Sequence, residues 1–203
     1  MLALDLGQVA PYQQILDYSC GAAVLKAVLQ HWGEYVDELT LIHEIGVDPD
    51  HGSTAQQVAD AARKRGYQAQ AKMFRSIDEL GTYTAQDIPV IVAMRSFRRP
   101  NQGHFVVATR VDPKHVEIMD PNVRGNRRTL TRSEMDRRWQ FRDRTGVLVM
   151  PKRKRASFGQ GAATGPTSQQ KTAWAIAGVL VVLAAATTGV VLYRRRRQQI
   201  QAY

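Results

Sequence analysis

The chain has 203 residues, which is room for one ordinary domain and a further segment, and its formal net charge is +10. All 18 acidic residues and 19 of the 28 basic residues precede residue 151, so the first 150 residues carry a net charge of only +1. The basic excess lies in the remaining residues, which disfavours a nucleic-acid-binding surface on the folded part. A single cysteine excludes an intramolecular disulfide and a cysteine-based zinc site.

Helices are predicted for the first third of the chain. Apolar side chains at helical spacing begin at Cys20, and Trp32 and Gly33 close this segment. Similar patterns predict three more helical segments, over residues 36–45, 53–66 and 76–80. Ser53 or Thr54 is the expected N-cap of the segment over 53–66.

Short apolar runs of the kind that form buried strands follow, over residues 88–94, 103–111, 115–120 and 146–150. A loop over 121–126 and a helix over 130–139 separate the last two of these strands. Helices that come first and antiparallel strands that come later indicate an α+β fold.

The composition divides the chain into four parts: a folded domain over 1–150, a flexible basic linker over 151–172, a transmembrane helix over 173–193 and a basic tail over 194–203. The 21 uncharged residues of the third part would span roughly 30 Å as a helix, the thickness of a bilayer core. No cleavable signal peptide is expected. Basic residues flank the predicted span on both sides, so its orientation stays open, with a cytoplasmic N-terminal domain favoured.

Cys20 is the first candidate for chemistry because it stands where an irregular polar segment turns into a helix. The positive end of the helix dipole stabilises a thiolate there. Gly21, which follows it, is expected to let a substrate backbone come close. A free cysteine also serves as a small buried hydrophobe, so a nucleophile needs a partner elsewhere in the chain.

His104 is the histidine best placed to be that partner. It follows Gly103 at the start of an apolar strand, and Asp120 ends the next strand after a tight turn. In this hairpin the two side chains lie near each other, so the carboxylate can orient the imidazole and stabilise its charged form. Asp120 followed by Pro121 is also an ordinary strand-ending turn, and the other four histidines are expected on the surface or satisfied in the core.

These motifs together resemble those of the bacteriocin-processing peptidase family, through Gln14 with Cys20-Gly21-Ala22-Ala23, Gly103-His104-Phe-Val-Val and Asp120-Pro121. The members are papain-like cysteine peptidases that remove double-glycine leader peptides, often as the N-terminal domain of an export ATPase. The resemblance covers residues 8–150 and implies a papain-like fold that needs no metal or cofactor. It implies Cys20 as nucleophile, His104 as general base and acid and Asp120 as its orienting residue. It also implies that Gln14 donates to the oxyanion hole.

The chain departs from the family pattern in two respects. Ser19 stands where an aspartate is common, with Asp17 displaced by two positions, which leaves the fine substrate preference open. One predicted span and a short tail stand in place of a transporter and its ATPase, so a double-glycine cleavage site is an analogy. The sequence thus predicts a single-pass, membrane-anchored cysteine endopeptidase that cleaves a peptide or leader sequence.

Arg98 and Arg99 precede His104 on one loop, where they could contact acidic residues of a substrate or form solvated surface. The expected partners are a peptide or protein substrate, a lipid bilayer through residues 173–193 and a transport or assembly complex, but not nucleic acid. One alternative is a catalytically idle peptidase-like domain that binds a peptide in a membrane-bound export, secretion or virion assembly. Another is a basic membrane protein whose tail contacts nucleic acid.

Overall fold

The fold is described from a computed structural model, which covers residues 9–123 and 125–152. Its helices are α1 Cys20–His31, α2 Glu38–Ile45, α3 Ala55–Lys64, α4 Ile77–Thr84 and α5 Arg132–Gln140. Its strands are β1 Gln68–Met73, β2 Val90–Arg95, β3 Gly103–Val111, β4 His115–Met119, β5 Arg127–Thr131 and β6 Thr145–Met150. In these ranges no helix has the length and apolar character that crossing a bilayer requires. The predicted span over 173–193, the basic tail and nearly all of the linker lie outside them.

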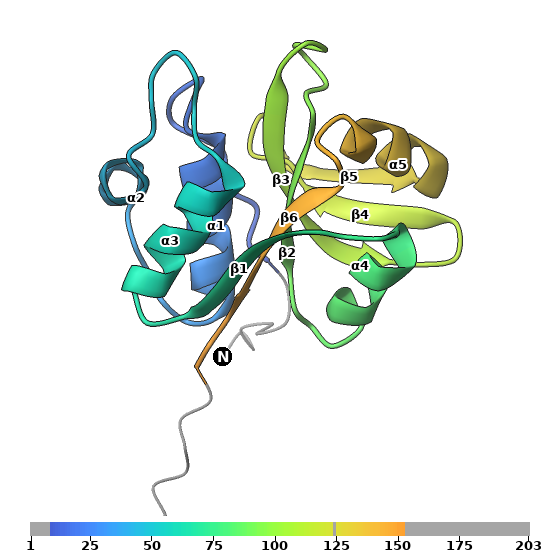
Figure 1. Cartoon of the computed structure of the whole chain (residues 1–203), viewed down its shortest axis with the longest axis horizontal. Coiled ribbons are helices and arrows are strands. Elements are labelled where there is room, and N and C mark those ends of the chain that lie inside the picture. The colour runs from blue at the N-terminus through green and yellow to red at the C-terminus, as the bar shows by residue number, and fades with distance from the viewer. Residues whose placement is uncertain (1–8, 124, 153–203) are drawn as a thin grey trace, which may run out of the picture. The chain divides into compact units, whose positions relative to one another are not determined.

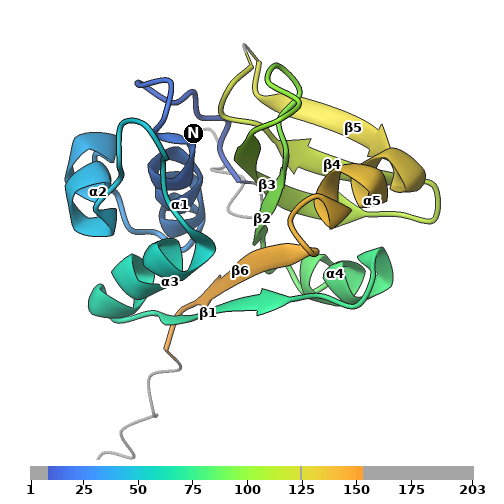
Figure 2. The same cartoon turned by 45° about the horizontal axis from the view of Figure 1, so that its top comes forward.

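The strands form one six-stranded sheet in the order β1-β6-β2-β3-β4-β5, and each neighbouring pair is antiparallel. Helices α1, α2 and α3 gather on one side of the sheet, whereas α4 and α5 lie on the other side (Figures 1 and 2). The architecture is therefore α+β with an antiparallel sheet, as the sequence predicted.

Two hydrophobic clusters fill the space between the helices and the two faces of the sheet. Along β2, Ile91 belongs to the cluster of α1, α2 and α3, whereas its neighbours Val90 and Val92 belong to the cluster of α4 and α5. Successive residues of a strand point to opposite faces. A central strand that is covered on both faces must therefore be apolar throughout, which explains the continuous apolar runs in the sequence.

The helix boundaries follow from side chains that cap exposed backbone N–H groups. The Asp37 carboxylate accepts from the N–H of Thr40 at the start of α2. Thr54 and Gln57 form a reciprocal capping box at the start of α3, so Thr54 rather than Ser53 is the N-cap. The Thr131 hydroxyl accepts from the N–H of Glu134 at the start of α5.

Both edge strands, β1 and β5, were missed by the sequence prediction. Among the described strands, β1 pairs only with β6, and β5 pairs only with β4. Each alternates polar residues with few apolar ones, because an edge strand buries little of its surface. The predicted helix over 130–139 was wrong at its start, since Leu130 and Thr131 belong to β5 and the helix begins at Arg132. The short turn predicted over 76–80 is a longer helix, α4.

Candidate active site

Cys20 is the first residue of α1 and is half-buried and free. The three apolar residues at Ala22, Ala23 and Val24 are buried in the core beneath it, so the helix N-terminus is held firmly in place. Its thiol therefore lies where the first N–H groups of the helix give a positive potential.

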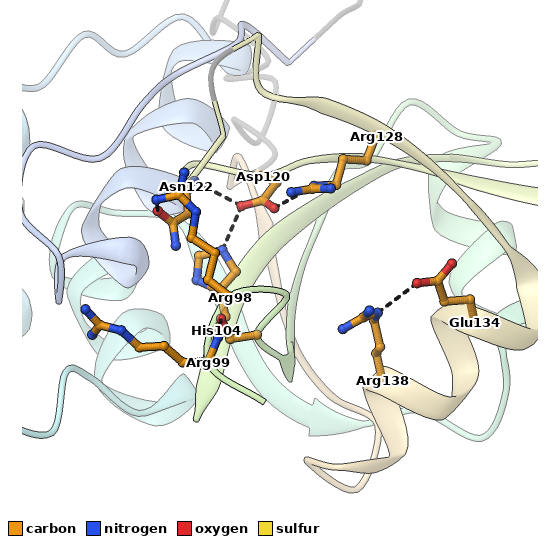
Figure 3. Close-up of polar contacts among 9 residues, drawn as sticks. Arg98, Arg99, His104, Asp120, Asn122, Arg128, Glu134 and Arg138 are labelled. Atoms are coloured by element: carbon orange, nitrogen blue, oxygen red, sulfur yellow. Dashed lines mark hydrogen bonds and ion pairs between the residues drawn. The ribbon is translucent and has the colours of Figure 1, made fainter. Parts of the chain in front are cut away.

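His104 is the second residue of β3, and Asp120 directly follows β4. The antiparallel pairing of these strands brings their ends together, and the side chains meet as the hairpin pattern predicted. The His104 Nε2 lies 2.7 Å from the Asp120 Oδ1 (Figure 3). Both residues are buried, at 7% and 1% exposure, so water competes little for this hydrogen bond.

Charge and burial act in opposite directions on the pKa of His104. Burial by itself lowers it, but the hydrogen bonds to Asp120 and Cys20 and the charges of both partners raise the pKa to about 9. The imidazole is therefore protonated at neutral pH. Asp120 uses Nε2 of the ring, which leaves Nδ1 as the nitrogen for the thiol of Cys20.

The same balance acts on Asp120. Burial raises the pKa of its carboxyl group, but the hydrogen bond and charge of His104, with smaller contributions from the N–H of Asn122 and the charge of Arg128, lower it overall. The Asn122 N–H donates to Oδ1 over 3.0 Å. Arg128 Nε donates to Oδ2, also over 3.0 Å (Figure 3). The carboxylate thus stays ionised beside a protonated imidazole.

Arg128 is a site residue that the sequence did not single out. It lies on β5, the edge strand that was not predicted, and its guanidinium also stacks 4.2 Å from the ring centroid of Phe97. Arg138 of α5 stacks on the same ring at 3.9 Å. Phe97 belongs to the loop between β2 and β3. The cation–π contact of Arg128 with Phe97 therefore attaches this loop to the residue that donates to Asp120.

Gln14 comes from the irregular segment before α1. Its backbone N–H donates to the carbonyl of Pro121 over 2.9 Å, which places Gln14 beside the turn that follows Asp120. Its side-chain Nε2 donates to the carbonyl of Leu16 over 2.7 Å. An amide nitrogen carries two hydrogens, so this contact uses one of the two.

Both glycines of the predicted site pack closely against other side chains of the protein. A Cβ atom at Gly21 would overlap the Oγ of Ser53. A Cβ atom at Gly103 would lie 2.6 Å from the guanidinium of Arg142. The missing side chains therefore serve close packing inside the protein at both positions.

Arg98 and Arg99 lie on the loop between β2 and β3 and reach the two neighbouring segments of the site. Arg98 donates to the side-chain oxygen of Asn122 over 3.3 Å, and Arg99 pairs with Asp17 over 3.4 Å. Asn122 follows Asp120 by two residues, and Asp17 precedes Cys20 by three. Both contacts are exposed, so a substrate carboxylate could replace the present partners at little cost.

Among the described residues, no group of three or more His, Cys, Asp or Glu side chains is arranged to hold a metal ion. The site brings together a thiol, a protonated imidazole and a buried carboxylate.

Comparison with known proteins gives a consistent result. Residues 8–154 match the model of the Peptidase C39 family. The chain is 32% identical over 143 residues to the lactococcin-G-processing and transport ATP-binding protein LagD of Lactococcus lactis subsp. lactis. The alignment covers 70% of this chain but only 18% of that protein, so the chain spans less than a fifth of this relative.

Solved structures support the fold. The peptidase domain of Streptococcus ComA, a bi-functional ABC transporter, superposes with a TM-score of 0.61 at 21% identity, covering 71% of this chain and all of that domain. A double glycine motif protease from an AMS/PCAT transporter, solved with its leader peptide, gives a TM-score of 0.56 at 24% identity, covering 72% and 94% of the two chains.

Proposed function

Because the chain belongs to the peptidase C39 family, we propose that it is a cysteine endopeptidase that cleaves a peptide or leader sequence by thiolate attack. At the level of the family, the sequence prediction of a bacteriocin-processing cysteine peptidase with an α+β papain-like fold is confirmed. The observation that supports the activity is the buried hydrogen bond between His104 and Asp120 next to Cys20. A thiolate paired with an imidazolium is the reactive form of such a site.

In the first half of the proposed reaction, the Cys20 thiolate attacks the carbonyl carbon of the scissile peptide bond. The C–S bond forms as the carbonyl π electrons move to oxygen, which gives a tetrahedral oxyanion. His104 is protonated at neutral pH, so it acts first as an acid and donates its Nδ1 proton to the leaving amine. The C–N bond then breaks, which leaves a thioester on Cys20 and a neutral imidazole.

In the second half, the neutral His104 acts as a base on a water molecule. The water oxygen attacks the thioester carbonyl and its proton passes to His104, after which the C–S bond breaks and the carboxylic acid product leaves. Asp120 holds the ring in one orientation throughout and stabilises the imidazolium that is restored at the end. The thiolate and imidazolium are thus regenerated.

The oxyanion needs donors that point to it before the reaction begins. We assign this role to the second hydrogen of Gln14 Nε2 and to the backbone N–H of Cys20. Two observations support the role of Gln14. Its backbone hydrogen bond to Pro121 places it beside the turn after Asp120, and its Nε2 has a second hydrogen besides the one donated to Leu16. Loss of one such donor typically costs about 10²–10³ in rate.

Arg98 and Arg99 are proposed as contacts for acidic residues of the substrate. Their present partners lie on the segments that follow Asp120 and precede Cys20, which supports a position along the path of a bound peptide. LagD by its name processes and transports lactococcin G, and the AMS/PCAT protease was solved with a leader peptide. A leader peptide is accordingly the substrate class proposed here, with a transport or assembly complex as partner.

The membrane anchor over residues 173–193 is part of the proposal. Its support is the sequence pattern, an uncharged stretch of bilayer length followed by four arginines. The peptidase domain is proposed to face the cytoplasm.

One experiment tests the catalytic proposal. The full chain is treated with iodoacetamide across pH, as wild type and as His104→Ala. We expect Cys20 to react well below pH 8.5, the pKa of an ordinary free cysteine, and to lose this reactivity in His104→Ala. If labelling follows an ordinary thiol and ignores His104, the peptidase proposal fails. Cleavage of a fluorogenic Gly-Gly peptide amide by wild type, and its loss in Cys20→Ser, separates an active enzyme from an idle peptide-binding domain.

A further inference from the structure

The segment before Cys20 is contacted by a buried carboxylate that the proposed reaction does not use. Glu38, the first residue of α2, is only 2% exposed. Its Oε1 accepts from the hydroxyl of Ser19 over 2.5 Å and from the backbone N–H of Ile15 over 3.2 Å. A carboxylate is costly to bury, and the hydrogen bonds from Ser19 and Ile15 offset part of that cost. The same hydrogen bonds fix the positions of Ser19 and Ile15.

Ser19 occupies the N-cap position of α1, where a serine side chain ordinarily accepts from an N–H of the first helical turn. In the part of the chain that the structure describes, Ser19 makes no such cap hydrogen bond with its side chain. Its Oγ instead lies 2.5 Å from Glu38 and 2.9 Å from the carbonyl of Leu16, and it accepts from the Leu16 N–H over 3.1 Å. The serine is turned away from its own helix.

This arrangement has two consequences for the reaction. The Cys20 N–H belongs to the peptide group that joins Ser19 to Cys20, so the contacts that hold Ser19 also fix the direction of this donor. The loop that carries Gln14 is also tied at two points, Ile15 and Ser19, to α2. Both proposed oxyanion donors therefore depend on one buried carboxylate from a different helix.

We infer that Glu38 is a positioning residue of the active site: through Ser19 and Ile15 it fixes the loop over residues 14–19, which carries Gln14 and leads into the N–H of Cys20. The inference rests on the proposed peptidase activity and concerns only how the oxyanion donors are held.

The test compares Glu38→Ala with Glu38→Gln in the full chain, using the fluorogenic Gly-Gly peptide amide and iodoacetamide. Glutamine keeps an oxygen that can accept from Ser19 and Ile15, whereas alanine has none. We expect kcat to fall about 10²-fold in Glu38→Ala with KM little changed, because the donors act mainly in the transition state. Glu38→Gln should retain most of kcat. The pH dependence of Cys20 labelling should be unchanged in both variants, because His104 and Asp120 are intact.

Ser19→Ala provides a second arm that leaves Glu38 in place. It should lower kcat in the same direction, and the double variant Ser19→Ala with Glu38→Ala should be little worse than Glu38→Ala alone, because Ser19→Ala removes one of the two contacts that Glu38→Ala removes. An unchanged kcat in Glu38→Ala, or a Glu38→Gln as impaired as Glu38→Ala, would overturn the inference. If Glu38→Ala does not fold, Ser19→Ala and Glu38→Gln carry the test alone, with kcat lowered in the first and retained in the second. Absent labelling and cleavage in wild type would instead count against the peptidase proposal.

Discussion

The contact between Cys20 and His104 can be tested through the titration of the histidine itself. In the folded protein the pKa of His104 is raised to about 9 from an ordinary value of 6.5. This difference corresponds to roughly 3 kcal/mol in favour of the imidazolium, after burial has acted against it. Replacing Cys20 by serine removes a group that can ionise and keeps one of similar size. Because Cys20 is one of the groups that raise the pKa of His104, this replacement should lower that pKa by roughly 1 to 3 pH units.

The titration is followed by the imidazole signals in carbon–proton NMR spectra from pH 5 to pH 10. His115, at the far end of the β3–β4 hairpin, serves as the internal control because it lies beside the turn at Asp112. The reasoning is refuted if His104 of the Cys20→Ser variant still titrates at its wild-type pH, since the thiol would then contribute nothing.

The same pKa links the site to stability. A group whose pKa is higher in the folded state binds a proton more tightly there, so its contribution is complete below pH 6.5 and is lost as pH rises through about 9. The alkaline side of the stability profile should therefore flatten in Cys20→Ser, where the folded pKa lies closer to the unfolded value. Urea unfolding at pH 6 and pH 9 measures this change.

Two further predictions concern residues around the catalytic pair. Arg128→Met removes the donor to Asp120 Oδ2, so the pKa of Asp120 should rise and the acid limb of the kcat/KM profile should move to higher pH, with a loss on the order of tenfold at neutral pH. Arg128→Lys keeps the charge and should shift the limb less; equal profiles for wild type and Arg128→Met would exclude this role. Gly21→Ala should destabilise the protein by about 1–3 kcal/mol in urea unfolding, because its Cβ would overlap the Ser53 hydroxyl. The added change Ser53→Ala should restore most of the lost stability. If Gly21→Ala alone leaves the free energy of unfolding unchanged, the loop at Ser53 can shift to make room for the new side chain.

The pairing of His104 with Asp120 could be predicted because its geometry is local. His104 and Asp120 lie on neighbouring strands joined by a tight turn, so the strand pattern and the turn together bring them to one end of the hairpin. Cys20 could be predicted because the start of helical spacing marks a helix N-terminus in the sequence itself. The role of Gln14 came only from the family resemblance, since an amide side chain in an irregular segment carries no periodic signal.

By itself, then, the sequence determined the α+β order of elements, the helix that begins at Cys20 and the hairpin that carries His104 and Asp120, because period and turn chemistry are properties of neighbouring residues. Only the tertiary structure placed Arg128 on Asp120, Ser53 against Gly21 and Glu38 beneath Ser19. These contacts join segments with no common pattern: β5 is a polar edge strand, and the carboxylate of α2 is separated by 19 residues from the serine that it holds. Which residues meet in these contacts depends on how the helices pack against the sheet, and the local sequence pattern does not predict that packing.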